Sequence, residues 1–148
     1  MRILIIEDEP ELARHIGRAL TRHGHFVDIR HDGITGLAAA QREAQAYIRA
    51  LFTWRKRTPL LHDGALTHYT PADGVYVYFR HAGTAAATGP SVMVALNRTD
   101  APVTVPLARF APFVRTGMRA RGALDGVEVD LGDTLVVPAK AATLLELP

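Results

Sequence analysis

The spacing of apolar residues changes near residues 40 and 41, which divides the chain into two parts. In the first part, residues 2–6 are one Arg followed by a run of Ile and Leu, typical of a strand buried on both faces of a parallel sheet. Helical spacing then runs from Pro10 to a stop at Gly24, and a short strand at residues 26–29 precedes a second helical stretch from Ile34. The first forty residues therefore predict a βαβα segment.

The second part begins with another helical pattern. From Gln41, apolar residues recur at positions i, i+3, i+4, i+7 and i+8, which predicts an amphipathic helix that ends near Lys56. The residues on its apolar face are Ala44, Tyr47, Ile48, Leu51 and Phe52. The run 54–57 (WRKR) places cations at the negative end of the helix dipole. An alternative interpretation of this run is a basic, aromatic patch that grips a nucleic-acid strand.

After Pro59, turn signals separate short apolar runs, and this rhythm predicts an antiparallel β-sandwich over residues 59–148. The predicted strands are residues 65–69, 75–80, 92–97, 103–105, 119–124, 127–131, 134–137 and 142–147. Residues 82–90 are mostly small and predict a loop. The fold class is therefore mainly β, with the sandwich preceded by an amphipathic helix (residues 41–58) and the short βαβα segment (residues 1–40).

Composition excludes several classes of function. The chain has 17 Lys and Arg against 15 Asp and Glu, so it carries no large basic field for a nucleic-acid or membrane partner. It has no cysteine, hence no disulfide, thiolate nucleophile or cysteine zinc site. The apolar run of residues 3–6 is too short for a signal sequence, and no run is long enough to span a membrane. We expect a cytoplasmic protein.

Two pairs of side chains are candidates for binding. Glu7 and Asp8 end the first predicted strand, where carboxylate oxygens can hold a hard cation such as Mg²⁺. Tyr76 and Tyr78 share one face of the strand at residues 75–80, opposite its buried positions. Because aromatic rings pack on the apolar faces of sugars, this tyrosine pair predicts either a sugar-stacking platform or packing against another element.

The other polar residues point to no catalytic site. Seven carboxylates of the second part fall mostly in turns, where Asp is favoured for its local hydrogen bonds. They are Asp63, Asp73, Asp100, Asp125, Glu128, Asp130 and Asp133. His23 and His25 flank Gly24 and supply two metal ligands without a third nearby.

The segment MRILIIEDEPELARHIGRALTRHGHFVDIRHDGITGLAAA, residues 1–40, resembles the start of a response-regulator receiver domain. The resemblance implies a Mg²⁺-binding role for Glu7 and Asp8. It also implies a phosphoacceptor Asp after a third strand, but residues 49–55 (RALFTWR) contain no carboxylate. No phosphoacceptor is therefore assigned, and phosphotransfer through this segment is not expected.

Residues 41–148 resemble the carboxyl-terminal end of cyclomaltodextrinases and neopullulanases of glycoside hydrolase family 13. The matching motifs are QREAQAYIRALFTWRKRTPLLHDG, LTHYTPADGVYVYFR, VMVALNRTDAPVTV and LVVPAKAATLLEL. The resemblance implies that the helix is the last of a catalytic barrel and that the strands form the sandwich after it. The carboxylates that family members use for hydrolysis lie on the barrel, so no catalytic residue is assigned here.

The leading hypothesis is a noncatalytic accessory β-sandwich of a cyclomaltodextrinase-like glycosidase, without the catalytic barrel and fused to a truncated receiver start. Its expected partner is a glycosidase barrel or a second copy bound through exposed apolar surface. One alternative is a degenerate receiver, acting in a phosphorelay or as a Mg²⁺-binding interaction module. Another is a module that binds starch or maltooligosaccharides, that is, an α-glucan, through Tyr76 and Tyr78.

Overall fold

The computed structural model describes residues 2–83 and 89–148. It divides the chain into two compact units, residues 1–50 and residues 51–148, and each unit is described by itself. The centre of the predicted loop at residues 82–90 lies outside the described residues.

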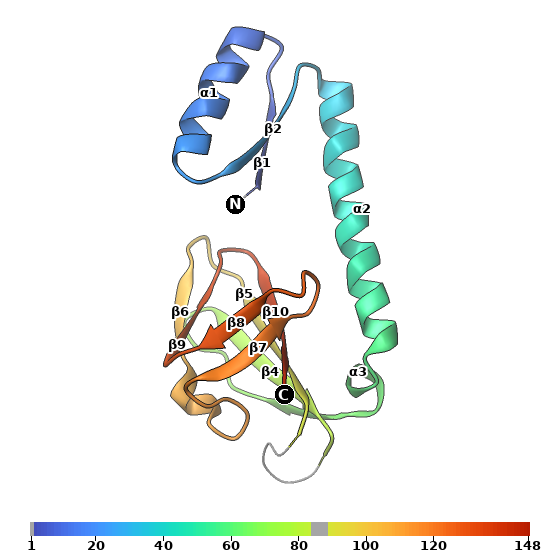
Figure 1. Ribbon diagram of the computed structural model, residues 1–148, viewed down its shortest axis with the longest axis vertical. Coiled ribbons are helices and arrows are strands. Elements are labelled where there is room, and N and C mark those ends of the chain that lie inside the picture. Colours follow the sequence, from blue (N-terminus) through green and yellow to red (C-terminus); the bar gives the residue numbers. More distant parts are fainter. Residues whose placement is uncertain (1, 84–88) are drawn as a thin grey trace. The chain divides into compact units, whose positions relative to one another are not determined.

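The first unit has the predicted order of elements (Figure 1). Strand β1 (Arg2–Ile6) and strand β2 (Phe26–Arg30) pair in parallel, and helix α1 (Pro10–Arg22) joins them. Helix α1 packs closely on one face of the pair, because Ala13 is fully buried and a Cβ added at Gly17 would lie 3.0 Å from Ile29 Cδ1.

Burial of β1 on both faces, expected from its run of Ile and Leu, is wrong. Ile5 is the one buried residue of this strand, whereas Ile6 keeps 49% of its surface exposed and Phe26 on β2 keeps 78%. A parallel strand is buried on both faces when it has neighbouring strands on either side and helices over both faces. In the described part of this unit β1 has a single neighbouring strand, and the helix that follows β2 approaches it at Ile6, against which a Cβ added at Gly36 would collide.

Helix α2 (Gly33–Arg57) runs without a break through the point where the spacing of apolar residues changes. The two predicted helical stretches are thus one helix, because residues 37–46 are mostly Ala, Gln, Arg and Glu, which favour helix and contain no breaker. Asp32 begins it, accepting a 2.8 Å hydrogen bond from the Thr35 amide. No helix of the described chain, α2 included, is long and apolar enough to cross a membrane.

The second unit is an antiparallel β-sandwich, as predicted. Six strands form one sheet in the order β3-β4-β5-β10-β7-β8, and β6 pairs with β9 in a second sheet (Figure 1). The strands are β3 (Ala65–His68), β4 (Val75–His81), β5 (Ser91–Asn97), β6 (Val103–Pro106), β7 (Met118–Gly122), β8 (Glu128–Leu131), β9 (Thr134–Val137) and β10 (Ala142–Leu147). All eight predicted strands are present within two residues at each end, whereas the short helices α3 (Leu60–Asp63) and η1 (Leu107–Phe110) were not predicted.

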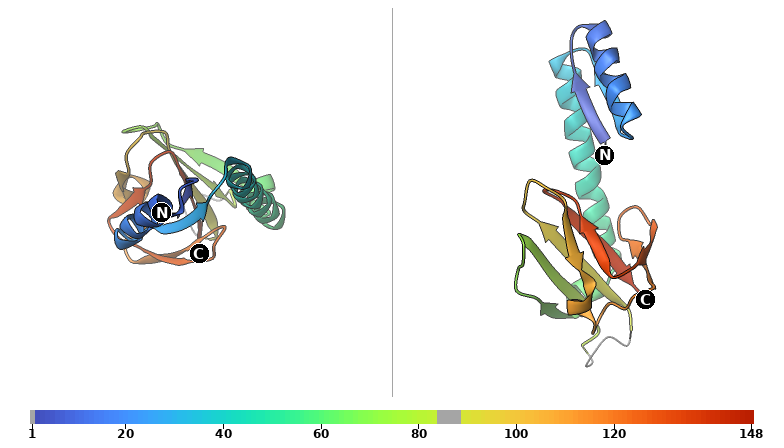
Figure 2. Two further views of the ribbon diagram at one scale, coloured as in Figure 1. Left: turned by 90° about the horizontal axis from the view of Figure 1, so that it is seen from above. Right: turned by 90° about the vertical axis from the view of Figure 1, so that its left-hand side faces the viewer.

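The core of this unit lies between the two sheets, and Figure 2 shows their strands from two further directions. Phe79 is fully buried, and its ring stacks on that of Phe113 with centroids 4.4 Å apart. Asn97 is buried at the end of β5, where its side-chain amide donates to the carbonyls of Ala101, Val137 and Pro138 at 2.9–3.1 Å. This single amide ties β5 to the end of β9, in the other sheet.

Candidate functional site

The side of the six-stranded sheet that faces away from β6 and β9, called the outer face here, carries the predicted tyrosine pair. Strand alternation and register bring side chains from β3, β4, β5 and β10 together on it. They are Leu66, His68, Tyr76, Tyr78, Arg80, Val92, Val94, Leu96, Leu144 and Glu146.

The end of α2 covers one half of the outer face. Trp54 is only 4% exposed and packs with Val92, Val94 and Ala123 in a small second core. Its indole Nε1 donates a 2.7 Å hydrogen bond to Glu146 Oε1. Helix α3 is fixed beside it, because Arg80 Nη2 donates to the Leu61 carbonyl at 2.9 Å. The helix end is therefore part of the sandwich.

Burial of Trp54 bears on the two interpretations of residues 54–57. The three cations do form the last turn of α2, as predicted. A nucleic-acid base cannot stack on an indole that is enclosed between a helix and a sheet, so Trp54 is not part of such a patch.

The predicted apolar face of the helix is wrong in part. Leu51 and Trp54 contact the sheet, whereas Tyr47, Ile48 and Phe52 remain between 47% and 56% exposed. Leu51 and Trp54 are three positions apart, so the sequence did indicate that they share a helix face. The basic residues that follow Trp54 made this spacing hard to recognise.

The other half of the outer face is open and aromatic. The rings of Tyr76 and Tyr78 lie 5.7 Å apart and inclined by 38°, and His68 meets Tyr76 edge-on at 6.3 Å. Leu96, opposite Tyr76 on β5, is 39% exposed. Burial raises the pKa of Tyr78, and the neighbouring Tyr76 raises it further. The two tyrosines thus differ, since Tyr78 packs under the helix end and Tyr76 faces the open half.

Glu7 and Asp8 lie just after β1, as predicted. Glu7 is half-buried and Asp8 is exposed, and Glu7 Oε1 accepts a 3.2 Å hydrogen bond from the Glu9 amide. Within residues 2–83 and 89–148, no group of three or more His, Cys, Asp or Glu side chains is arranged to hold a metal ion. The pair therefore offers two carboxylates, and a Mg²⁺ ion there would take its remaining ligands from water.

Several carboxylates of the second unit have structural partners. Asp125 Oδ1 accepts the Val127 amide at 3.0 Å, and Asp133 Oδ1 accepts the Thr116 hydroxyl at 2.9 Å. Asp100 lies 3.2 Å from Lys140 Nζ. The contact of Asp125 is the local turn bond expected from the sequence, whereas those of Asp133 and Asp100 join distant parts of the chain.

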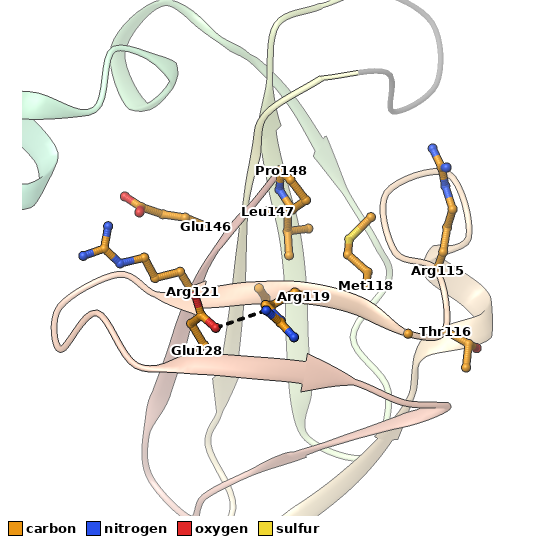
Figure 3. A pocket seen from close by; sticks show the side chains of 11 residues that line it. Arg115, Thr116, Met118, Arg119, Arg121, Glu128, Glu146, Leu147 and Pro148 are labelled. Atoms are coloured by element: carbon orange, nitrogen blue, oxygen red, sulfur yellow. Dashed lines mark ion pairs between the residues drawn. The ribbon is translucent and has the colours of Figure 1, made fainter.

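An open depression of about 690 Å³ lies where β10 ends beside β7 (Figure 3). Arg119 and Arg121 line it, with Met118 and the carboxyl end of β10. Arg119 is already paired, at 3.5 Å with Glu128 and at 3.3 Å with Asp130. Arg121 stands opposite Glu146 in the ladder, so opposite charges face each other across the two strands.

Solved structures share the fold of this chain. AmyP in complex with maltose matches with a TM-score of 0.58 and 20% identity, over 72% of this chain and 20% of that chain. An AmyP variant in complex with maltotriose matches with a TM-score of 0.56 and 18% identity, over 82% of this chain and 24% of that one. An alpha-amylase from Anoxybacillus matches with a TM-score of 0.51 and 22% identity, over 68% of this chain and 21% of that chain. The chain thus spans about a fifth to a quarter of these proteins.

Curated relatives match a short segment. Transcriptional activator protein IrlR of Burkholderia pseudomallei is 46% identical over 43 residues, 29% of this chain and 19% of the relative. Transcriptional regulatory protein TcrA of Mycobacterium tuberculosis is 49% identical over 39 residues, 26% of this chain and 15% of the relative. The chain spans less than a fifth of either regulator.

The family comparison covers most of the sandwich. Residues 66–146 match the family described as the cyclo-malto-dextrinase C-terminal domain, from β3 almost to the end of β10. The match includes Tyr76 and Tyr78 and the strands that form the outer face. Since it spans more than half of the chain, the protein belongs to the cyclo-malto-dextrinase C-terminal domain family.

Proposed function

We propose that this chain is a noncatalytic accessory module that packs against a glycosidase catalytic barrel. The observation that carries the proposal is the outer face, half covered by the end of α2 and half open around Tyr76 and Leu96. The resemblance to family 13 enzymes, stated above, implies that this helix is the last of a barrel. The AmyP chains that share the fold are four to five times as long as the region matched here, which leaves room in them for such a barrel.

Hydrolysis assays test the noncatalytic part of the proposal. The purified chain is incubated with cyclodextrin, pullulan and soluble starch, and the release of reducing ends is measured. We expect no release above a blank preparation. Glycoside hydrolysis requires a pair of carboxylates that flank the bond, and the resemblance implies that the family's pair lies on the barrel. An activity that follows the chain through two independent purification steps would contradict the proposal.

A stability measurement tests the partner. A cyclomaltodextrinase shortened to its barrel should unfold at a higher temperature when this chain is added in excess, since a ligand of the folded state stabilises it. The variant Leu96→Glu places a charge on the open half and should abolish the effect. Val136→Glu, at an exposed position on β9, is the matched control and should retain it.

The open aromatic half supports a second candidate function, binding of an α-glucan. Tyr76 offers a ring face beside His68, and the rims of both side chains carry hydrogen-bonding groups. Titration with maltoheptaose followed by calorimetry measures such binding. Tyr76→Ala should abolish the heat of binding, whereas Tyr47→Ala, at an exposed tyrosine of α2, should leave it unchanged. Equal binding of maltoheptaose by both variants would exclude the outer face as the binding site.

The first unit carries a third candidate role, that of a degenerate receiver that binds Mg²⁺ without phosphotransfer. The curated regulators match over 43 and 39 residues, close to the length of residues 1–40, and Glu7 and Asp8 follow β1 as that resemblance requires. On this hypothesis the chain is a fusion of a receiver start with an accessory module. Mg²⁺ affinity should be lost in Asp8→Ala and kept in Asp73→Ala, an acidic turn residue of the sandwich. Equal affinity in both would exclude the site.

A further inference from the structure

The two-stranded sheet of the first unit has two outer edges with different chemistry. The Glu7 amide donates to the Arg30 carbonyl at 3.0 Å, which fixes the backbone groups of Arg30 on the side of β1. Because backbone groups alternate along a strand, those of Val27 and Ile29 face the outer edge of β2. By the same alternation, those of Arg2, Leu4 and Ile6 face the outer edge of β1.

The outer edge of β2 is protected. The guanidinium of Arg30 folds back and donates a 2.7 Å hydrogen bond to the Ile29 carbonyl, which occupies an acceptor of that edge. Asp28 adds a charge in the middle of the strand and pairs with Arg2. Charged side chains of this kind keep an edge strand from pairing with another chain.

The outer edge of β1 carries a single charge, that of Arg2 at its first residue. Its residues after Arg2 are Ile3, Leu4, Ile5 and Ile6, without a charge or a Pro. In the described part of the chain, β1 pairs with β2 alone. Ile6, whose backbone groups face this edge, is 49% exposed. An apolar edge with open backbone groups favours the addition of another strand.

We propose that the β1 edge binds the β1 edge of a second copy of this chain, in antiparallel pairing about a two-fold axis through Leu4. In this register Leu4 stands opposite its own copy and Arg2 stands opposite Ile6 of the partner subunit. The outward backbone groups of Arg2, Leu4 and Ile6 then all find partners, and the two sheets become one of four strands. The two Arg2 side chains lie at opposite ends of the pairing, so like charges do not meet. This inference is independent of the accessory role of the sandwich.

A single cysteine tests the register, because the chain has none of its own. Directly opposite residues in a hydrogen-bonded antiparallel pair have Cα atoms about 5.5 Å apart, within the range that a disulfide spans. Leu4→Cys should therefore form a covalent dimer rapidly under mild oxidation. Phe26→Cys is the matched control. Position 26 on β2 is 78% exposed, so a cysteine there meets other molecules more readily, yet it lies away from the proposed two-fold axis.

Two measurements on the unchanged chain complete the test. Sedimentation should show a dimer whose fraction rises with concentration. Amide exchange followed by NMR should show protection of Leu4 and Ile6 that rises in parallel, while Val27 and Ile29 stay unprotected. A chain that stays monomeric, or a dimer in which Phe26→Cys cross-links as fast as Leu4→Cys, would overturn the proposal.

Discussion

Strands β1 and β5 have similar apolar sequences but different surroundings. In β1, RILII, one residue is buried, whereas in β5, SVMVALN, all residues except Leu96 are buried. Strand β5 lies between β4 and β10, with the main core on one face and the end of α2 on the other. An apolar run therefore predicts that a strand forms, and the number of elements packed around it decides whether it is buried.

The largest expected effect separates the cores of the two units. Phe79→Ala removes a fully buried ring that contacts Phe113, Phe110 and Tyr69, and should lower the free energy of unfolding by about 3–5 kcal/mol. Ile5→Ala, at the buried position of β1 in the first unit, should change the free energy of unfolding of the sandwich by less than about 0.5 kcal/mol. Urea unfolding followed by Trp54 fluorescence measures both. Equal losses would mean that the two units unfold together.

Asn97 tests how the second unit holds its two sheets together. Asn97→Ala leaves the carbonyls of Val137 and Pro138 without their donor and should cost more than about 2 kcal/mol in urea unfolding. Asn97→Asp keeps the acceptor for the Thr99 amide but has no amide donor, so a similar loss is expected. A loss under about 0.5 kcal/mol in both variants would contradict this role.

The end of α2 marks where the second unit begins. Trp54→Phe removes the donor to Glu146 and should destabilise the sandwich by about 1–3 kcal/mol. Phe52→Ala changes an exposed ring two residues earlier in the same helix, and the change should stay within about 0.5 kcal/mol. Urea unfolding followed by far-ultraviolet circular dichroism allows both to be measured. If Phe52→Ala costs as much as Trp54→Phe, the helix contacts its surroundings through a different face.

The smallest expected effect lies at the start of α2, in the first unit. The Thr35 hydroxyl and amide both donate to the Asp32 carboxylate and hold the pKa of Asp32 below its usual value. The stability of this cap is therefore fully present above about pH 3.9 and is lost as the pH falls through the lowered pKa. Amide exchange of the first turn should accelerate below that pH. Asp32→Asn keeps an oxygen acceptor but does not titrate, so it should remove the pH dependence of this exchange. The same pH profile in Asp32→Asn as in the unchanged chain would contradict the role of Asp32.

The sequence predicted the strands of the second unit well because their alternation and turn residues are local signals. It placed Tyr76 and Tyr78 on one face of β4, but it did not show that the end of α2 divides them. That division depends on Trp54 meeting Glu146, a contact across 92 positions that spacing along the chain does not carry. Burial of β1 was wrong for a related reason, since the run of Ile and Leu does not tell how many elements surround it.

Amide hydrogen exchange of the whole chain tests most directly the claim that the family domain, with the end of α2, forms the stable unit. We predict slow exchange in β4, β5 and β10 and around Trp54, and exchange faster by several orders of magnitude in α1, β2 and the first turns of α2. Addition of cyclodextrin or Mg²⁺ should leave the protection of the core strands unchanged. Equal protection throughout residues 2–50 and 51–148, lost in one cooperative step, would contradict the account.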